Sequence, residues 1–443
     1  MFCRLIITIF VLISPAFGDW NPYYLLGSAR DHNEIRFSQT FPEQPSYDWR
    51  GDYSVMGPSV DFGVGLIKSI SPHWDLSFES SFGYSVAQSS VGITAITGVN
   101  GQASMDRDWM FSGRVMPVYK KYGEIGGVLG LELMNYNMSS DIASFASVGS
   151  DTSQLAAGVL IGVTTQSPVA ENWSIRLSWL ETLFLQYEYD AILPDSNPYT
   201  NELNDGTEVT TNIQHVSFKP TIDRFMASII YFPRGQELTR VITPKVEKAK
   251  NYVLFNFVKD VSEMNESQDE EQVLKIFHMP LAVSGWGGEL TAGRRFNVND
   301  TFFFGIEGFA HFLNSFEENQ GLHTQTRFEE QLEHNWDVGF VLAPGVIIGE
   351  GQNLVLLAGI ARGDFTDRGN TGNEDINPID LKSWGGVAGV RQEITLDDHW
   401  RLALGMKTIR FQSMQVQTRG TYSLNDFDDI SSGIYSVGLM YSW

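Results

Sequence analysis

The last twelve residues of the chain constrain its fold more than any other segment. In an extended strand, successive side chains point to opposite faces. One face of this strand is apolar and aromatic and carries Tyr435, Val437, Leu439, Tyr441 and Trp443. The opposite face is smaller and mixed, with Ile434, Ser436, Gly438, Met440 and Ser442. The pattern alone therefore predicts a half-buried strand at the carboxyl terminus.

The amino terminus has the pattern of an export signal. Arg4 precedes the apolar run Leu5 to Ile13, and Ala16-Phe17-Gly18 supplies small residues at the minus-three and minus-one positions of a signal-peptidase site. The apolar run is well short of the roughly 20 residues that a membrane-spanning helix needs. We therefore predict a cleaved signal peptide at residues 1–18. Cys3, the only cysteine, precedes the apolar run, so the mature chain should have neither disulfides nor thiol chemistry.

Composition limits how the rest of the chain could cross a membrane. The chain has 443 residues and is 42% hydrophobic, yet after the signal no apolar run is long enough for a helical span. Such a chain can cross a membrane only as a closed barrel of alternating strands, each needing about 9 to 11 residues. The formal charge of −23, from 30 basic and 53 acidic residues, argues against nucleic acid as a partner.

Short polar connections alternate with long ones, which is the asymmetry of outer-membrane barrels. The expected short turns are Ser69 to His73, Lys120 to Glu124, Ser167 to Asn172, Asn297 to Asp300, Glu350 to Asn353 and Leu396 to His399. The expected long loops are Arg30 to Gly57, Gln88 to Arg107, Met138 to Ser153, Asp190 to Thr221, Lys259 to Leu281, Asn314 to Glu333, Gly363 to Leu381 and Gln415 to Ser431.

The two halves of the chain repeat each other in order and spacing, although their identity is low. The segment from Asp61 to Tyr84 aligns with the segment from Trp286 to Phe312, and the correspondence continues to the closing strand. Each half offers about eight strands. We therefore divide the mature chain into a first repeat at 19–233, a linker or long turn at 234–250, and a second repeat at 251–443.

This layout resembles the small eight-stranded outer-membrane proteins of the opacity-protein type. The shared features are a strand with spaced glycines (Gly63 and Gly65), a short turn, an aromatic strand bearing the inward acid Glu79, and a final strand ending in an aromatic residue, here Trp443. The resemblance implies an all-β, antiparallel up-and-down transmembrane barrel in the outer membrane of a diderm bacterium. It also implies that outer-membrane lipids, lipopolysaccharide and the barrel-assembly machinery are partners, with Tyr441 and Trp443 read as the assembly signal.

Two arrangements of about sixteen strands remain open at this point. The halves could form two tandem eight-stranded barrels, or one sixteen-stranded barrel in which residues 234–250 are only a long turn. Eight strands give a lumen filled by side chains, whereas sixteen strands leave an aqueous channel. The expected inward residues are bulky, which favours tandem barrels: Met110, Arg114, Met116, Phe303, Glu307 and Phe309.

Strand parity selects the candidate lumen residues. If Trp74 and Phe78 face lipid, Glu79 faces the interior, and the repeat places Glu307 at the same position. The opposite parity would put an ionised carboxylate into hydrocarbon. The candidate cationic partners are Arg114, Arg176, Arg391, Arg401 and Lys407. These charges could form an ion-pair network that fills a narrow barrel, or they could line an open pore.

Tryptophans follow three of the expected short turns, at Trp74, Trp173 and Trp400. Together with Tyr441 they predict an interfacial girdle, because indole is apolar yet carries an N–H group that headgroups can satisfy. No catalytic, metal-binding or nucleotide-binding motif is present, so we expect neither an enzyme nor a cofactor. The predicted role is to present long acidic and polar loops at the cell surface, for structure, adhesion or recognition. The alternative is a sixteen-stranded porin for passive, cation-preferring diffusion of small solutes.

Overall fold

The structure is a computed structural model. It describes residues 19–40, 49–86, 88–94, 100–121, 123–140, 152–192, 199–202, 208–211, 213–235, 249–270, 275–323, 326–348, 351–371, 374–375, 378–417 and 423–443. The predicted signal peptide lies outside these residues, as does most of the predicted linker. None of the described residues forms a helix of the length and apolar character that a membrane span requires.

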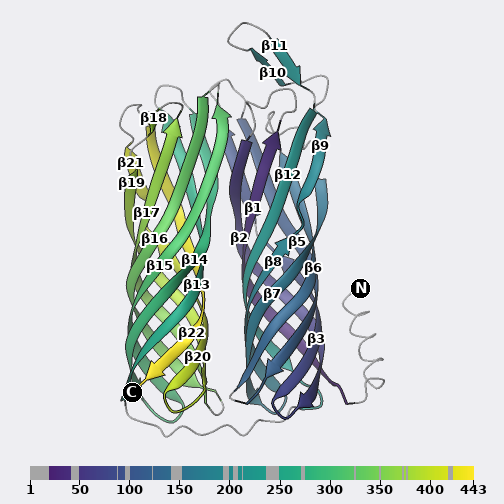
Figure 1. Ribbon diagram of the computed structural model, residues 1–443, viewed down its shortest axis with the longest axis vertical. Helices are drawn as coiled ribbons and strands as arrows, with labels where there is room; N and C mark the ends of the chain where they lie inside the picture. Colours follow the sequence, from purple (N-terminus) through teal and green to yellow (C-terminus); the bar gives the residue numbers. More distant parts are fainter. Residues whose placement is uncertain are drawn as a thin grey trace.

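The first half of the chain forms a closed antiparallel barrel of eight strands (Figure 1). Its strands are β1 (Asn21–Thr40), β2 (Trp49–Ser71), β3 (Trp74–Ser85) continued by β4 (Gln88–Thr94), β5 (Asn100–Tyr119), β6 (Glu124–Ser140), β7 (Thr152–Ala170), β8 (Trp173–Phe184) continued by β9 (Tyr187–Ile192), and β12 (Ile213–Tyr231). Each strand pairs with the next, and β12 returns to pair with β1, where Tyr231 lies opposite Tyr24. A small hairpin, β10 (Tyr199–Glu202) with β11 (Glu208–Thr211), lies beyond the outer rim.

The second half closes in the same way. Its strands are β13 (Ala249–Glu270), β14 (Lys275–Asn297), β15 (Phe302–His323), β16 (Thr326–Ile347), β17 (Gln352–Thr371), β18 (Glu374–Asp375) leading into β19 (Ile379–Thr395), β20 (Trp400–Phe411) continued by β21 (Met414–Gln417), and β22 (Ser423–Ser442). The terminal strand β22 pairs with β13, where Ser442 lies opposite Tyr252. The prediction of two eight-strand sets forming two barrels is therefore confirmed. The alternative of a single sixteen-stranded barrel is wrong, because the first and last strands of each half pair with each other.

Several predicted loops are instead the outer ends of long strands. Strand β13 continues to Glu270 and β14 begins at Lys275, so the expected loop from Lys259 to Leu281 is largely paired sheet. Likewise, β15 and β16 stay paired as far as His323 and Thr326. Beyond the membrane both faces of a strand are in water, so the alternation of apolar and polar residues that marks a strand disappears. Polar composition therefore predicts a loop where the structure has paired strands.

The outer surface of each barrel carries a band of apolar side chains. Along β3 burial alternates residue by residue, so that Trp74, Phe78 and Phe82 face outwards. Twelve residues at about 3.3 Å each, tilted by about 40°, give roughly 30 Å of height, which matches the hydrocarbon core of a bilayer. A closed barrel with this exterior is a transmembrane barrel of the outer-membrane type.

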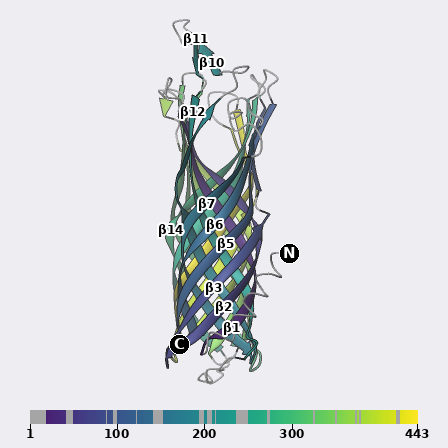
Figure 2. The same cartoon turned by 90° about the vertical axis from the view of Figure 1, so that its right-hand side faces the viewer.

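The two barrels stand side by side with their strands running in the same general direction (Figures 1 and 2). Above the apolar band their sheets are joined by backbone pairing. Strand β14 pairs with β2 at Leu281 and Tyr53 and with β4 near Phe277 and Ile93, and β15 pairs with β2. The barrels are therefore joined through their sheets as well as through the chain between them.

Candidate functional site

The lower lumen of the first barrel is organised around Glu79. This carboxylate, 4% exposed, accepts hydrogen bonds from Arg114 Nη1 at 3.1 Å and Arg176 Nη1 at 2.6 Å. The Tyr23 hydroxyl donates a further bond to Glu79 Oε2 at 2.8 Å. Because β1, β3, β5 and β8 each contribute one of these groups, the cluster crosses the whole lumen.

A second charged cluster lies nearer the outer end of the same lumen. Arg224 donates to Asp31 Oδ1 at 2.8 Å and to Glu132 Oε2 at 3.2 Å, and Arg107 bonds the other oxygen of Asp31. All four side chains are buried. These four residues were not selected from the sequence, although the alternation of side chains along β1 and β12 places Asp31 and Arg224 on the inward face. Apolar side chains fill the space around the two clusters, among them Ala29, Met116, Leu160, Leu180 and Met226.

In the second barrel, Glu307 is held by Arg391, which donates from Nη1 at 2.9 Å and Nη2 at 2.5 Å. Arg391 also contacts Glu393 at 3.1 Å. The other two predicted cations have different carboxylate partners: Arg401 lies 3.5 Å from Glu393, and Lys407 lies 2.6 Å from Glu289. All seven predicted lumen residues therefore face the two interiors, but only Arg114, Arg176 and Arg391 bind Glu79 or Glu307.

A chain of histidines and carboxylates continues from Lys407 towards the outer end. His311 contacts Glu289 at 3.3 Å and Asp337 at 3.1 Å. His334 in turn lies 2.9 Å from Asp337 and 2.8 Å from Asp260. Each imidazole faces a carboxylate at both ring nitrogens, and it can donate to both only when both nitrogens carry a proton. The described residues contain no group of His, Cys, Asp or Glu side chains that could hold a metal ion.

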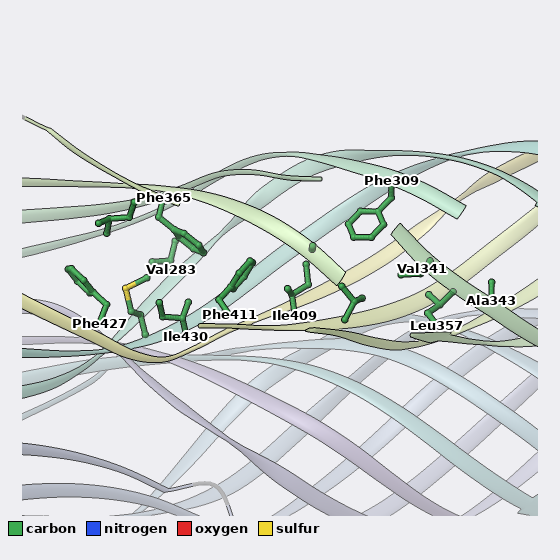
Figure 3. Packing of buried hydrophobic residues seen from close by; sticks show 14 of the residues in the cluster. Val283, Phe309, Val341, Ala343, Leu357, Phe365, Ile409, Phe411, Phe427 and Ile430 are labelled. Carbon is green, nitrogen blue, oxygen red and sulfur yellow. The ribbon is translucent and has the colours of Figure 1, made fainter. Parts of the chain in front are cut away.

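An apolar column fills the remaining interior of the second barrel (Figure 3). Phe365 stacks on His334 with ring centroids 4.2 Å apart, and it meets Phe411 edge-on at 5.3 Å. Further members of the column are Phe303, Phe309, Val341, Leu357, Ile409, Phe427 and Ile430. Since these side chains are buried and in mutual contact, they pack this part of the lumen.

The inner rim carries a repeated pair of aromatic rings. Trp74 lies 5.1 Å from Tyr119, Trp173 lies 4.8 Å from Tyr231, and Trp400 lies 5.0 Å from Tyr441. The three tryptophans are 40 to 46% exposed, as an interfacial girdle requires. Trp443 stacks on Tyr441 at 6.0 Å. Tyr435 shares their strand face but is only 1% exposed, because it lies between the barrels instead of facing lipid.

The contact between the barrels has an apolar centre. Tyr435 of β22 stacks against Trp179 of β8 at 6.2 Å and Phe225 of β12 at 6.3 Å. Trp179 also meets Trp286 at 5.7 Å. Leu177 and Leu404 complete the cluster. These side chains point outwards from their barrels, so packing one barrel on the other removes them from lipid.

Polar groups lie above and below this apolar centre. Near the inner rim, Thr165 donates to Gln392 at 2.7 Å, and Ser167 bonds both Gln392 and Gln352. Near the outer rim, Lys259 of the second barrel lies 3.9 Å from Asp223 of the first, with both side chains buried. Sequence reasoning missed this contact. The signal was present, because Asp223 and Arg224 are adjacent on one strand and so cannot both face the lumen.

A glycine permits a close approach of the two barrels at the inner rim. Gly123, in the turn between β5 and β6, has a φ of +145°. A Cβ atom there would lie 2.5 Å from Ile394 of the second barrel. Both the backbone conformation and the contact between the barrels therefore favour glycine at this position.

Comparison with known proteins gives only weak similarity. No family model matches the chain, and no curated protein matches it significantly. Among solved structures, it is similar to Ail, the attachment invasion locus protein of Yersinia pestis, at 12% identity and a TM-score of 0.25, over 44% of this chain and 99% of that one. Neisserial surface protein A matches at 12% identity with a TM-score of 0.22, over 42% of this chain and 97% of that one. The toluene transporter TodX of Pseudomonas putida matches at 8% identity with a TM-score of 0.26, over 95% of this chain and 89% of that one. Superpositions this weak carry no argument about function, and the fold assignment rests on the strand pairing.

Proposed function

We propose that the chain is an integral outer-membrane protein whose two barrels are filled, and that it acts by presenting its outer surface to an extracellular partner. The observation that carries this proposal is the content of the lumens. Ion pairs around Glu79 and Asp31 cross the first barrel, and the apolar column around Phe365 and Phe411 occupies the second. A protein built in this way has rigid membrane anchors and no open axis for solutes.

The chemistry of the outer strand ends suggests the kind of partner. In sequence, the outer end of β13 carries Glu263, Glu266, Asp269 and Glu270, and β22 brings Asp426 and Asp428 alongside it in register. The outer ends of β15 and β16 carry Glu317, Glu318, Glu329, Glu330 and Glu333. Acidic residues at the outer ends of these strands favour a basic partner, because charge complementarity speeds encounter and selects among partners.

Conductance in planar lipid bilayers tests the filled barrels. The purified, heat-modifiable protein should give no discrete current steps at amounts at which a known porin in the same apparatus gives them. Reproducible cation-selective steps that scale with the protein added would contradict the proposal. They would support a diffusion function through an eight-stranded lumen, since the sixteen-stranded porin has lost its structural basis.

Adhesion of expressing cells tests the outer surface. Cells that display the chain should bind immobilised polylysine more strongly than cells without it, and salt should weaken the binding. A variant with Glu317, Glu318, Glu329, Glu330 and Glu333 changed to Gln should lose most of the gain while reaching the membrane at the same level. Equal binding by this variant would remove the outer ends of β15 and β16 from the proposal.

A further inference from the structure

A cleft of about 530 Å³ lies between the two barrels on their outward faces. The first barrel lines it with Arg30 of β1 and with Met56 and Pro58 of β2, and the second barrel lines it with Thr408 and Arg410 of β20. Neither barrel alone forms this cleft, because its two walls come from different halves of the chain.

The guanidinium of Arg30 crosses the cleft and meets no acid among the residues that the structure describes there. Its Nη1 donates to Thr408 Oγ1 at 2.9 Å, and its Nη2 donates to Ser431 Oγ at 3.3 Å and approaches Met56 Sδ at 3.9 Å. Among the described residues it therefore has two hydroxyls and a thioether as acceptors and no carboxylate. The cleft wall holds a second guanidinium, Arg410, and one carboxylate, Glu263, so its lining carries a net positive charge.

The height of the cleft matches the level of lipid headgroups. Arg30 pairs with Pro58 in the β1–β2 register, and the Val86 amide, just past the end of β3, donates to the Pro58 carbonyl at 3.2 Å. Since β3 starts at the girdle residue Trp74, the cleft lies at the opposite edge of the apolar band, about 30 Å away. Below it the first barrel exposes Leu26, Val60 and Phe62, a wall suited to acyl chains.

We propose that this cleft binds one phosphate-bearing lipid of the outer leaflet, with its phosphate on Arg30 and Arg410 and its acyl chains below. A phosphate oxygen gives Arg30 the anionic acceptor that the protein does not supply, and guanidinium groups bind phosphate through paired hydrogen bonds. The acyl chains of the same lipid would cover the apolar wall of Leu26, Val60 and Phe62 below the cleft. The inference rests on the membrane location in the proposed function, not on the acidic surface or its partner.

Native mass spectrometry of the full chain in a neutral detergent tests the site with three matched probes. Dioleoylphosphatidic acid should form a one-to-one adduct. Dioleoylglycerol, which lacks the phosphate, should bind at least roughly tenfold more weakly, and inorganic phosphate alone should not saturate the protein. Arg30→Gln should weaken the phosphatidic acid adduct by roughly tenfold, and Arg410→Gln should also weaken it.

Arg362→Gln is the matched control, because Arg362 is an exposed cation over Trp384 that does not line the cleft. It should leave the adduct unchanged. Heat modifiability on gels confirms that each variant remains a closed barrel. The proposal is overturned by equal weakening in the Arg362 and Arg30 variants, by equal binding of dioleoylglycerol, or by saturation with inorganic phosphate. Absence of any phosphatidic acid adduct in a folded wild-type sample overturns it as well.

Discussion

Tyr23 donates a hydrogen bond to Glu79 across the glycine that separates their strands, and the second barrel repeats this relationship at the same register. In the first barrel Tyr23 lies opposite Gly65, and Gly65 lies opposite Glu79. In the second, Tyr252 lies opposite Gly293, which lies opposite Glu307, and Tyr252 donates to Glu307 at 2.5 Å. First, second and third strands contribute the same residue types in both barrels, which is consistent with a tandem duplication.

The two equivalent glutamates should differ in their importance for stability. Glu79→Gln leaves Arg114 and Arg176 without a carboxylate partner among the described residues, which should cost roughly 3 to 5 kcal/mol of unfolding free energy. Glu307→Gln should cost less, because Arg391 keeps Glu393. Urea unfolding in detergent micelles measures both values. A larger loss for the Glu307 variant would show that these ion pairs do not control the stability of the two barrels.

The glycine between tyrosine and glutamate should tolerate no side chain. A Cβ at Gly65 would overlap the ring of Tyr23, and one at Gly293 would lie 2.7 Å from the ring of Tyr252. Gly65→Ala should therefore displace the tyrosine and lower the unfolding free energy by roughly 1 to 3 kcal/mol. Gly127→Ala is the control, because a Cβ there meets no atom within 4 Å. Equal stability of the two variants in the same urea series would contradict the role given to Gly65.

Asp223 should have opposite effects in the whole chain and in the first barrel alone. In the whole chain Asp223→Val leaves Lys259 buried without its partner and should lower stability. Expressed alone, residues 19–233 should still close into a heat-modifiable, protease-resistant barrel, because β12 pairs with β1. There Asp223 would face the headgroup edge of the membrane, where a carboxylate costs little, so the same change should raise stability by no more than about 1 kcal/mol. A shift of the same sign in both proteins would argue against the contact between the barrels.

The terminal aromatic residues should be needed for assembly more than for export. Deleting Tyr441 to Trp443 removes the stacked rings at the inner rim and the end of the closing strand. We expect the shortened chain to cross the inner membrane but to fail to insert in the outer membrane. Membrane fractionation with a heat-modifiability gel measures both steps. Heat-modifiable barrels at the normal level in the outer-membrane fraction would contradict the assembly signal.

One turn at the inner rim should weaken in acid. The Asp397 carboxylate accepts the backbone N–H groups of His399 and Trp400, each at 2.8 Å, and these bonds lower its pKa. A lowered pKa in the folded state means that the contribution to stability is present above the unfolded value, near 3.9, and is lost as the pH falls through the folded value.

Asp397→Asn tests this turn, because asparagine keeps the acceptor but does not titrate. Asn299 already occupies the corresponding place in the turn before β15, where it accepts the Thr301 and Phe302 amides at 2.8 and 2.7 Å. Between pH 6 and pH 3, the urea midpoint of the wild type should fall slightly more than that of the variant. Identical falls would mean that Asp397 does not contribute to the acid sensitivity.

Strand alternation was enough to indicate a transmembrane barrel and to place Glu79, Glu307 and their candidate cations on inward positions. It could do so because lipid accepts only apolar side chains, so each membrane-spanning strand must show a period of two. The alternation ends where the strands leave the membrane, so the sequence predicts loops where the outer ends of β13 to β16 are paired strands. The sequence could not predict which charged residues pair inside a lumen, since Arg391 and Glu307 are 84 residues apart and meet only when the barrel closes.

The fold class, the approximate number of strands and the inward face were predictable from the amino-acid sequence, because they follow from local periodicity and from the cost of an unpaired polar group in lipid. The closure of each half on itself, the position of Tyr435 and Asp223 between the barrels, and the cleft that Arg30 crosses became visible only in the folded chain. Those features depend on which outward faces meet. Parity reports only that a side chain points away from the lumen, and it cannot distinguish a neighbouring barrel from a lipid.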